Sequence, residues 1–325
     1  MSKATYWLGV DLGGTKMLAA LFTSKFKLLV ERKEKTSGQD GAKAVIARLQ
    51  QLIADTVVEG GIPERQLGGI GLGVPGPVNV QTGAVISAPN LGWHNLPLQK
   101  ILERSCHSPV RVFNDVDAGT YGEFRFGTGE QARCVIGLFP GTGIGGGCVY
   151  DGKVFTGREN SCFEIGHMQA VPDGRLCGCG RHGCLEAHAS RLAIAADAAA
   201  AAFRGQAPAL LKLTGTDLRE IKSRTLAKAI AAGDRAIEDI VRRAARQLGV
   251  AAASVVNLIA PDIIVLGGGL VEALGKLYLE EVRAAVAQHA MPLLADRVKV
   301  RAAQLGDRAS VLGAAALVAE ALGKP

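Results

Sequence analysis

Residues 6–22 read YWLGVDLGGTKMLAALF, in which two apolar runs flank a glycine turn. The pattern predicts a strand, a tight turn and a returning strand. Glycine lacks a Cβ, so the backbone N–H groups of Gly13 and Gly14 can approach phosphate oxygens, and Thr15 and Lys16 add side-chain donors. Taken alone, the stretch fits a phosphate-binding turn and a plain β-hairpin equally well.

Asp11 ends the first of these strands. A carboxylate at this place can hold Mg²⁺ through water, because Mg²⁺ keeps much of its hydration shell when it binds protein. The turn differs from the Walker phosphate loop, which requires G-x-x-x-x-G-K-[ST] between a strand and a helix. The segment is therefore a candidate site for a phosphate with its magnesium ion.

The same order of elements returns at residues 135–150, which read VIGLFPGTGIGGGCVY. The run satisfies G-x-G-x-x-G, but a dinucleotide site requires a helix directly after it, and Asp151-Gly152 instead predicts a hairpin. We therefore interpret Gly141, Thr142 and Gly143 as a second phosphate-binding turn. Two halves that each open with strand, turn and strand predict an α/β fold of two lobes facing each other across a cleft.

Composition narrows the class of protein. The chain has 325 residues, of which 48% are hydrophobic and 21% charged, a balance that fits two globular domains. The uncharged run 134–150 contains a proline and six glycines, so we expect no membrane helix there and no membrane partner. The net charge of +7 arises from basic residues interleaved with acids, which indicates solvated helix faces and requires no nucleic acid. Seven cysteines without a secretory signal predict reduced or metal-bound thiols in the cytoplasm.

A third glycine cluster, Gly267, Gly268 and Gly269, follows an apolar strand and precedes a helix. Bare backbone at such a place lets a flat ring such as adenine lie against it. A helix that starts close to a sheet explains the same three glycines. Taken alone, the cluster favours this second explanation.

His167, Cys177, Cys179 and Cys184 lie close together in a glycine-rich segment. Three thiolates and one imidazole suit tetrahedral Zn²⁺ in a closed structural site. His182 is an alternative imidazole ligand. The spacing differs from that of a nucleic-acid zinc finger, in which paired cysteines stand two residues apart and a long helix precedes the histidines.

Two aspartates are expected at helix starts. Asp40 is expected to cap a helix whose apolar residues share one face, and Asp115 follows the apolar run 110–113. The position of Asp115, taken alone, favours the same capping role. In an α/β protein, however, the C-terminal end of a strand is also where ligands bind. A carboxylate there could act as a general base and take the proton of an attacking sugar hydroxyl.

Seven segments occur in one order that resembles the ROK family (repressors, open reading frames and kinases) of actin-like sugar kinases, and most of all its bacterial glucokinases. They are GVDLGGTK at 9–16, GVPGP at 73–77, PNL at 89–91, ND at 114–115, GTGIGGG at 141–147, EIGH at 164–167, and CGCG with GCLE at 177–180 and 183–186. They span nearly the whole chain. Their combination is specific, whereas each turn by itself is not.

The resemblance implies a two-lobed actin-like (ribonuclease H-like) ATPase fold and an ATP-dependent sugar kinase. In such kinases the residue at Asp115 deprotonates the 6-hydroxyl of a hexose, which then attacks the γ-phosphate of ATP. The matching positions imply sugar contacts at Gly76, Asn90, Asn114, Asp115, Glu164, His167 and Glu186. They imply nucleotide and magnesium contacts at Asp11, Gly13, Gly14, Thr15, Lys16, Gly141, Thr142, Gly143, Gly267, Gly268 and Gly269.

The resemblance also implies roles for the lobes and the metals. A small lobe over 1–116 would carry sugar and phosphate contacts, with the helix over 306–325 packed on it. A large lobe over 117–305 would carry the nucleotide site and the zinc segment. Zn²⁺ would be structural, held by His167, Cys177, Cys179 and Cys184, and Mg²⁺ catalytic. Relatives suggest a homodimer or homotetramer.

Two departures from the family pattern concern substrate choice. Cys162 and Phe163 stand where Ala-Gly usually precedes the Glu-x-Gly-His segment, and Asp117 stands where asparagine is common. Glucose is the leading substrate, and N-acetylmannosamine, N-acetylglucosamine, fructose and mannose are alternatives because Phe163 is much bulkier than glycine. Polyphosphate could replace ATP as the donor.

Two other classes of protein share some of these features. A sugar-sensing repressor without catalysis would carry a DNA-binding domain ahead of the kinase-like body, and the first turn begins already at Gly13, so we expect no such domain. A zinc-dependent interaction module would have no use for carboxylates at Asp11 and Asp115. The sequence therefore favours a sugar kinase.

Overall fold

The computed structural model describes residues 5–323, so residues 1–4 and 324–325 of the expected small lobe and its helix lie outside the described residues. The chain forms two compact units. The first combines Met1–Gln131, Gly147–Phe163 and Asp307–Pro325, and the second combines Ala132–Gly146 and Glu164–Gly306. The two lobes expected from the sequence were defined by the ligands that each would hold, whereas these units are defined by compactness. The bounds of the lobes therefore stay a prediction.

The first unit contains a five-stranded sheet in the order β3-β2-β1-β4-β8. Its strands are β1 (Tyr6–Leu12), β2 (Lys16–Thr23), β3 (Leu28–Lys35), β4 (Leu67–Val74) and β8 (Val110–Asn114). β1, β2 and β3 pair antiparallel, whereas β1 with β4 and β4 with β8 pair parallel. The strand, turn and returning strand predicted over 6–22 are confirmed.

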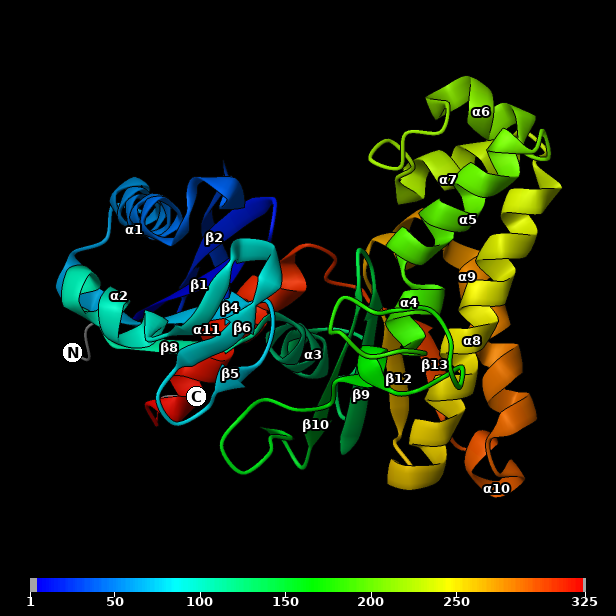
Figure 1. Cartoon of the computed structure of the whole chain (residues 1–325). Coiled ribbons are helices and arrows are strands. Elements are labelled where there is room, and N and C mark those ends of the chain that lie inside the picture. The colour runs from blue at the N-terminus through cyan, green and yellow to red at the C-terminus, as the bar shows by residue number, and fades with distance from the viewer. Residues whose placement is uncertain (1–4, 324–325) are drawn as a thin grey trace. The chain divides into compact units, whose positions relative to one another are not determined.

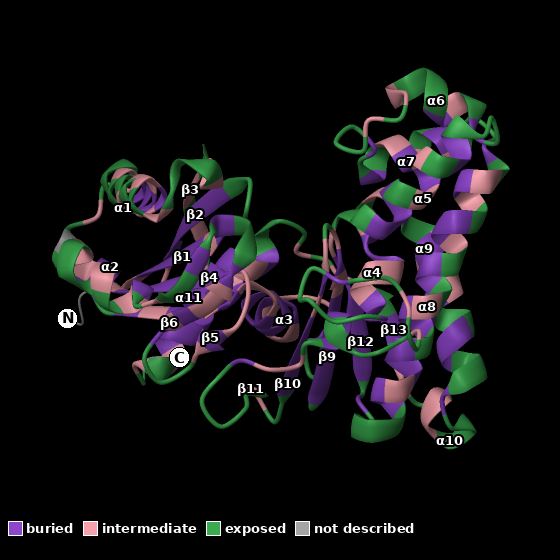
Figure 2. Cartoon of the chain, viewed as in Figure 1, coloured by how far each residue is buried: buried purple, intermediate pink, exposed green. Residues whose placement is uncertain are grey.

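Both faces of this sheet are covered, because its apolar side chains alternate between two cores (Figure 2). Helix α1 (Ala42–Glu59) packs on one face with buried side chains that include Val45, Leu49 and Leu52. Each such side chain stabilises the fold by about 1.5–3 kcal/mol when fully buried. Asp40 does not cap α1, contrary to the prediction: Gly41 occupies the cap position, and the Asp40 carboxylate instead accepts a hydrogen bond from Arg48 at 2.9 Å.

Helix α11 (Arg308–Ala321) covers the other face and lies against β1 and β4, as Figure 1 shows in red. This packing depends on bare backbone in the sheet. A Cβ on Gly9 would stand 1.7 Å from the Val311 carbonyl oxygen, and one on Gly71 would stand 1.9 Å from that of Ala314. The glycines therefore let the helix backbone approach the sheet more closely than any side chain allows.

The remaining elements of the first unit surround this sheet. A small antiparallel sheet has the order β5-β6-β7, with β5 (Val78–Asn79), β6 (Ala84–Ala88) and β7 (Trp93–Leu96). Helix α2 (Leu98–Cys106) precedes β8, and α3 (Asp115–Phe126) follows it and packs on α11. Short 3₁₀ helices form at η1 (Gly38–Asp40), η2 (Glu64–Gln66) and η3 (Pro89–Leu91).

The second large sheet has the order β11-β10-β9-β12-β13. Its strands are β9 (Cys134–Pro140), β10 (Ile144–Tyr150), β11 (Lys153–Val154), β12 (Ile263–Leu266) and β13 (Lys299–Ala302). As in the first sheet, the strand before the glycine turn is central, its hairpin partner lies on one side and two parallel strands lie on the other. The expected duplication is thus confirmed at the level of topology.

Helices dominate the rest of the second unit. They are α4 (Leu185–Ala189), α5 (Arg191–Phe203), α6 (Pro208–Thr214), α7 (Ser223–Ala231), α8 (Arg235–Ile259), α9 (Gly269–His289) and α10 (Pro292–Ala295), with the 3₁₀ helix η4 (Ile165–His167). The long helices α8 and α9 pack on each other, and β12 leads directly into α9. Among the described residues, no helix combines the length and apolarity that crossing a membrane would require.

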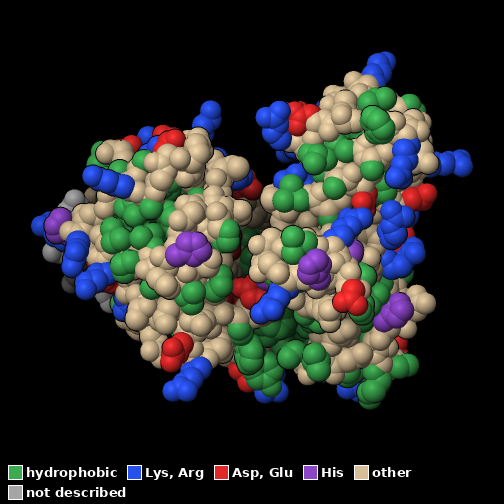
Figure 3. Space-filling model, viewed as in Figure 1, with side chains coloured by type: hydrophobic (Ala, Val, Ile, Leu, Met, Phe, Trp, Pro, Cys, Tyr) green, Lys and Arg blue, Asp and Glu red, His purple; other side chains and the backbone are tan. Residues whose placement is uncertain are grey.

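Charged side chains of both signs are interspersed over the face shown in Figure 3. On α8, Arg242 pairs with Glu238 at 2.6 Å and with Glu281 of α9 at 2.8 Å. Arg242 is therefore balanced by nearby carboxylates, in keeping with the interleaved charge pattern of these helices.

Candidate active site

Asp115 is the first residue of α3, directly after β8 ends at Asn114. The helix cap is Asn114 and not Asp115: the Asn114 side-chain oxygen accepts hydrogen bonds from the backbone N–H groups of Val116 at 2.9 Å and Asp117 at 3.0 Å. The capping role that the sequence favoured for Asp115 is therefore wrong. The half-buried Asp115 carboxylate accepts a hydrogen bond from the Val116 N–H at 2.9 Å and lies where the positive end of the helix dipole favours an ionised acid.

Gly76 lies beside this junction. Its carbonyl oxygen accepts a hydrogen bond from the Asn114 amide at 3.1 Å, so two of the expected sugar-binding residues contact each other. Gly76 has a φ of +85°, and a Cβ there would stand 2.1 Å from the Ser87 carbonyl oxygen. The glycine is therefore required by the backbone. The Asn114 amide bonds three backbone groups, which leaves it one N–H for a ligand.

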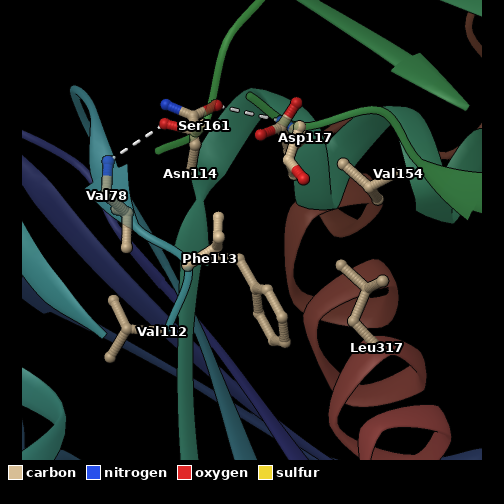
Figure 4. Close-up of a pocket in the computed structure, with 10 residues that line it drawn as sticks. Val78, Val112, Phe113, Asn114, Asp117, Val154, Ser161 and Leu317 are labelled. Atoms are coloured by element: carbon tan, nitrogen blue, oxygen red, sulfur yellow. Dashed lines mark hydrogen bonds between the residues drawn. The ribbon is translucent and has the colours of Figure 1, made fainter. Parts of the chain in front are cut away.

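A cavity of about 120 Å³ in the first unit extends from Asn114 and Asp117 toward α11 (Figure 4). Its lining consists of Val78, Val80, Val112, Phe113, Asn114, Asp117, Val154, Thr156, Ser161 and Leu317. Most of these side chains are apolar, and Asp115 is not among them. The cavity therefore does not include the residue expected to act on the sugar.

The first glycine turn is a β-hairpin turn held by a neighbouring threonine. The Gly13 carbonyl oxygen accepts a hydrogen bond from the Thr36 hydroxyl at 2.6 Å, and the Gly13 N–H donates to the Lys16 carbonyl oxygen at 3.0 Å. Gly14 and Thr15 are exposed, with Asn90 of η3 close by: a Cβ on Gly14 would stand 3.6 Å from that of Asn90. Three segments from different parts of the chain therefore meet at this turn.

The charged groups beside the first turn are already partnered. Lys16 pairs with Asp307 at 2.6 Å, and the Asp11 carboxylate accepts a hydrogen bond from the Ser310 hydroxyl at 3.0 Å. Burial raises the pKa of Asp11 to about 6, with hydrogen bonding by Ser310 and the charge of Lys16 opposing the shift. A carboxylate so desolvated gains from binding a cation.

The second glycine turn is hydrogen-bonded at both ends to the segment from α4 to α5. The Glu186 carboxylate accepts a hydrogen bond from the Ile144 N–H at 2.9 Å, and a Cβ on Gly143 would stand 2.2 Å from the same oxygen. At the other end, the Arg191 N–H donates to the Gly141 carbonyl oxygen at 2.8 Å, and its guanidinium donates to the Thr142 hydroxyl at 3.0 Å. Sequence reasoning missed Arg191, which matches none of the seven segments.

The third glycine cluster starts α9. A Cβ on Gly267 would stand 2.5 Å from the Phe139 ring, and Gly268 has a φ of +82°. Close packing and backbone conformation therefore account for these two glycines. This agrees with the explanation that the sequence favoured, a helix that starts close to a sheet. Contact of Gly267, Gly268 and Gly269 with adenine stays a prediction.

The four expected metal ligands are brought together in the second unit. The ligand atoms of His167, Cys177, Cys179 and Cys184 all lie within 4.8 Å of one another. His167 comes from η4, the first two cysteines from the glycine-rich loop, and Cys184 from the residue before α4. His182 is not among them, and its Nδ1 instead lies 3.0 Å from the Gly174 carbonyl oxygen.

The spacing of these atoms fits zinc. The distance between the sulfurs of Cys179 and Cys184 is 3.7 Å, and that from the Cys177 sulfur to His167 Nδ1 is also 3.7 Å. A tetrahedron with zinc–sulfur bonds of about 2.3 Å places its sulfurs about 3.8 Å apart. Burial raises the pKa of Cys177 to about 12, so this thiol needs a bound cation to ionise at neutral pH.

Two carboxylates lie beside the cluster. The Glu186 side chain is 3.7 Å from the Cys177 sulfur, and so it touches both the cluster and the second glycine turn. Burial raises the pKa of Glu164, while the charge of His167 opposes the shift. The structure thus brings Glu164, His167 and Glu186 together in the second unit, and Gly76, Asn114 and Asp115 together in the first.

Known proteins resemble the chain over nearly its full length. Glucokinases from Thermotoga maritima and Streptomyces coelicolor are 34% and 35% identical to it, over 97% and 96% of this chain and 98% and 97% of theirs. The crystal structure of a ROK family glucokinase from Streptomyces griseus in complex with glucose and AMPPNP matches with a TM-score of 0.84 at 33% identity, covering 97% of this chain and 98% of that one. These likenesses confirm the two-lobed actin-like fold. A model of the ROK family matches residues 7–321, and the chain therefore belongs to that family.

Proposed function

We propose that this protein is an ATP-dependent hexose kinase that phosphorylates the 6-hydroxyl, with glucose as its substrate. The observation that carries the proposal is full-length similarity to glucokinases, one of them solved with glucose and AMPPNP, together with the retained aspartate at the start of α3. AMPPNP is an analogue of ATP, which supports ATP as the phosphoryl donor.

Asp115 is the proposed general base. Its carboxylate would accept the proton of the 6-hydroxyl as that oxygen attacks the γ-phosphorus and ADP departs. Because Asn114 performs the capping role, Asp115 can meet the substrate without loss of the helix start. The hydrogen bond from the Val116 N–H orients the carboxylate.

Sugar hydroxyls are proposed to bind Gly76, Asn90, Asn114 and Asp115 from the first unit and Glu164, His167 and Glu186 from the second. Carboxylates and amides suit this task because they accept or donate several hydrogen bonds each. Bidentate and clustered contacts of this kind position one hydroxyl for attack.

Zn²⁺ is proposed at His167, Cys177, Cys179 and Cys184, where it would be structural. The fit of the sulfur and nitrogen spacing to a tetrahedron supports this assignment. A fixed His167 ring would orient a sugar contact, and Glu186, two residues after Cys184, would be held in place by the same loop.

ATP is proposed to lie along the two glycine turns and the glycines before α9. Its magnesium ion would be held near Asp11, whose desolvated carboxylate gains from a cation. When bound, Mg²⁺ would neutralise the charge that develops on the phosphate oxygens. The Gly13 N–H is already bonded to the Lys16 carbonyl oxygen, so the chain's own part is to orient the phosphates through the backbone N–H groups of Gly14 and Gly143.

N-acetylmannosamine, N-acetylglucosamine, fructose, mannose and a polyphosphate donor are the alternatives within the same chemistry. Phe163 bears on them, because it holds a φ of +67° in which side chains are rare and it directly precedes Glu164. A ring at this place adds bulk beside a proposed sugar contact, which favours a sugar without a 2-acetamido group.

The test of function is ADP release measured with glucose, mannose, fructose, N-acetylglucosamine and N-acetylmannosamine, with ATP and polyphosphate as donors. We expect turnover with glucose and ATP. Asp115→Asn should lower kcat at least about 100-fold, because general-base catalysis contributes about that much, while circular dichroism stays unchanged. Asp55→Asn, a matched surface change in α1 of the same unit, should retain activity. Full turnover by Asp115→Asn would contradict the proposed base.

A further inference from the structure

We propose that Arg191 is a phosphate-binding residue of the nucleotide site, acting at the Gly141–Thr142 end of the second glycine turn. The residue lies outside the segments that identify the family. The inference rests on the proposed function in assuming that this turn holds nucleotide phosphate.

Arg191 is fixed to the turn by two contacts. Its backbone N–H donates to the Gly141 carbonyl oxygen at 2.8 Å, and its guanidinium donates to the Thr142 hydroxyl at 3.0 Å. The guanidinium carries five N–H donors, so most remain for an anion, and its planar fork matches two phosphate oxygens. Because the Thr142 oxygen accepts from Arg191, the Thr142 proton stays available to the same anion.

The guanidinium of Arg191 differs from the other arginines of its unit in how its charge is balanced. In the part of the chain that the structure describes, no ion pair joins its guanidinium to a carboxylate, whereas Arg175, Arg219, Arg242 and Arg246 of the same unit are each paired. Arg191 is half-buried, and burial lowers the pKa of its guanidinium. A desolvated cation without a counterion gains from a bound anion.

The place of Arg191 in its helix also works against helix stability. It is the first residue of α5, a helix with no acidic residue in its first turn. A cation at that end opposes the helix dipole, which favours anions there. A cation retained against the helix dipole is one of the local mismatches that occur at functional sites, and the helix end adds to the field that attracts a phosphate.

The opposite end of the turn carries the opposite charge. Glu186 accepts the Ile144 N–H, so the carboxylate stands at one end and the guanidinium at the other. Phosphate would be repelled from the Glu186 end, where sugar hydroxyls are proposed to bind, and attracted to the Gly141–Thr142 end. The turn thus has a polarity that separates the two substrates.

The experiment measures affinities for ATP and for adenosine by competition against a fluorescent ATP analogue, using the zinc-loaded full chain. Arg191→Gln, which keeps a donor for Thr142 but removes the charge, should weaken ATP binding about 10- to 100-fold and leave adenosine binding unchanged. The ATP affinity of Arg191→Lys should fall between those of wild type and Arg191→Gln. Arg219→Gln is the control, because it removes an equal charge from an exposed, paired arginine of the same unit and should bind ATP normally.

Three outcomes would overturn the inference. Unchanged ATP affinity in Arg191→Gln, with wild type phosphorylating sugar, would refute Arg191 alone and leave the proposed function standing. An equal loss for ATP and adenosine would show that Arg191 only shapes the turn. Failure of wild type to bind ATP would refute the proposed function and the inference together.

Discussion

At the scale of single residues, Asn114 takes the helix-capping role that the sequence favoured for its neighbour Asp115. Asn114 caps α3 and bonds Gly76, and the general base is proposed at the adjacent Asp115. A sequence cannot distinguish two adjacent polar residues at a helix start, because either can cap. The distinction depends on which side chain turns back toward the helix N–H groups.

The first residue-scale prediction concerns Asp11, whose pKa of about 6 exceeds the ordinary value of 3.8. Below pH 3.8 both the folded and the unfolded chain hold the proton, so stability is complete. As the pH rises from 3.8 to 6, the Asp11 carboxyl ionises in the unfolded chain but stays protonated in the folded chain. The free energy of unfolding therefore falls by about 3 kcal/mol over this range. Asp11→Asn cannot ionise, so its free energy of unfolding should exceed that of wild type by about this amount at pH 8 and match it near pH 3.5.

Denaturant titration in magnesium-free buffer measures this difference, because a cation bound by the Asp11 carboxylate would stabilise the charged form. Ser310 can still donate to the oxygen of an asparagine, so the hydrogen bond is kept. A gap between the two proteins that did not change with pH would show that burial does not disfavour the charge of Asp11.

At the scale of elements, short loops bring distant ligands to one point. The cysteine-bearing loop over 176–182 forms a small hairpin, with Leu176 bridging to His182 and the Cys177 N–H donating to the Arg181 carbonyl oxygen at 2.8 Å. Gly183 has a φ of +77° and leaves no space for a side chain, since a Cβ would stand 1.9 Å from the Val171 carbonyl oxygen. The backbone of the loop therefore preorganises its cysteines.

The prediction at this scale is the loss of metal from the loop. Cys177→Ser should reduce bound zinc from about one ion per chain to almost none and weaken sugar binding, because His167 loses its fixed orientation. Elemental analysis and glucose titration measure the two effects. Cys106→Ser, a half-buried thiol of α2 outside the cluster, should keep its zinc. Wild-type protein without zinc would contradict the site.

At the scale of the whole molecule, a strand from early in the chain and a helix from late in the chain pack against each other. β1 near the N-terminus and α11 near the C-terminus share a core that includes Trp7, Val311 and Val318. The first unit is therefore built from three separate segments of the chain, and many of its contacts join residues that are far apart in sequence.

The prediction at this scale concerns the contact between β4 and α11. Gly71→Ala places a Cβ against the Ala314 backbone, which cannot yield, and should lower the free energy of unfolding by about 3 kcal/mol or more. Gly69→Ala on the same strand meets only methyl ends of Val318 and Leu322 at 3.0 Å and a carbonyl oxygen at 3.3 Å, and should cost less. Equal losses in thermal unfolding would show that α11 shifts freely.

Much of this architecture could be predicted from residue order alone. The runs around Gly13 and Gly141 predicted two hairpins because apolar alternation and glycine turns act over a few neighbouring residues. The cysteine and histidine cluster was also predictable, because three of its members lie within eight residues and its ligand types are few.

Which distant groups meet depends on the tertiary structure. Arg191 lies about fifty residues from Thr142 in sequence and hydrogen-bonds it in space, and Lys16 pairs with Asp307 from the far end of the chain. The order of residues encodes local backbone preference, whose range is a turn or a strand. Contacts of this kind depend instead on how whole helices and sheets pack, since a side chain finds its partner only after those elements have come together.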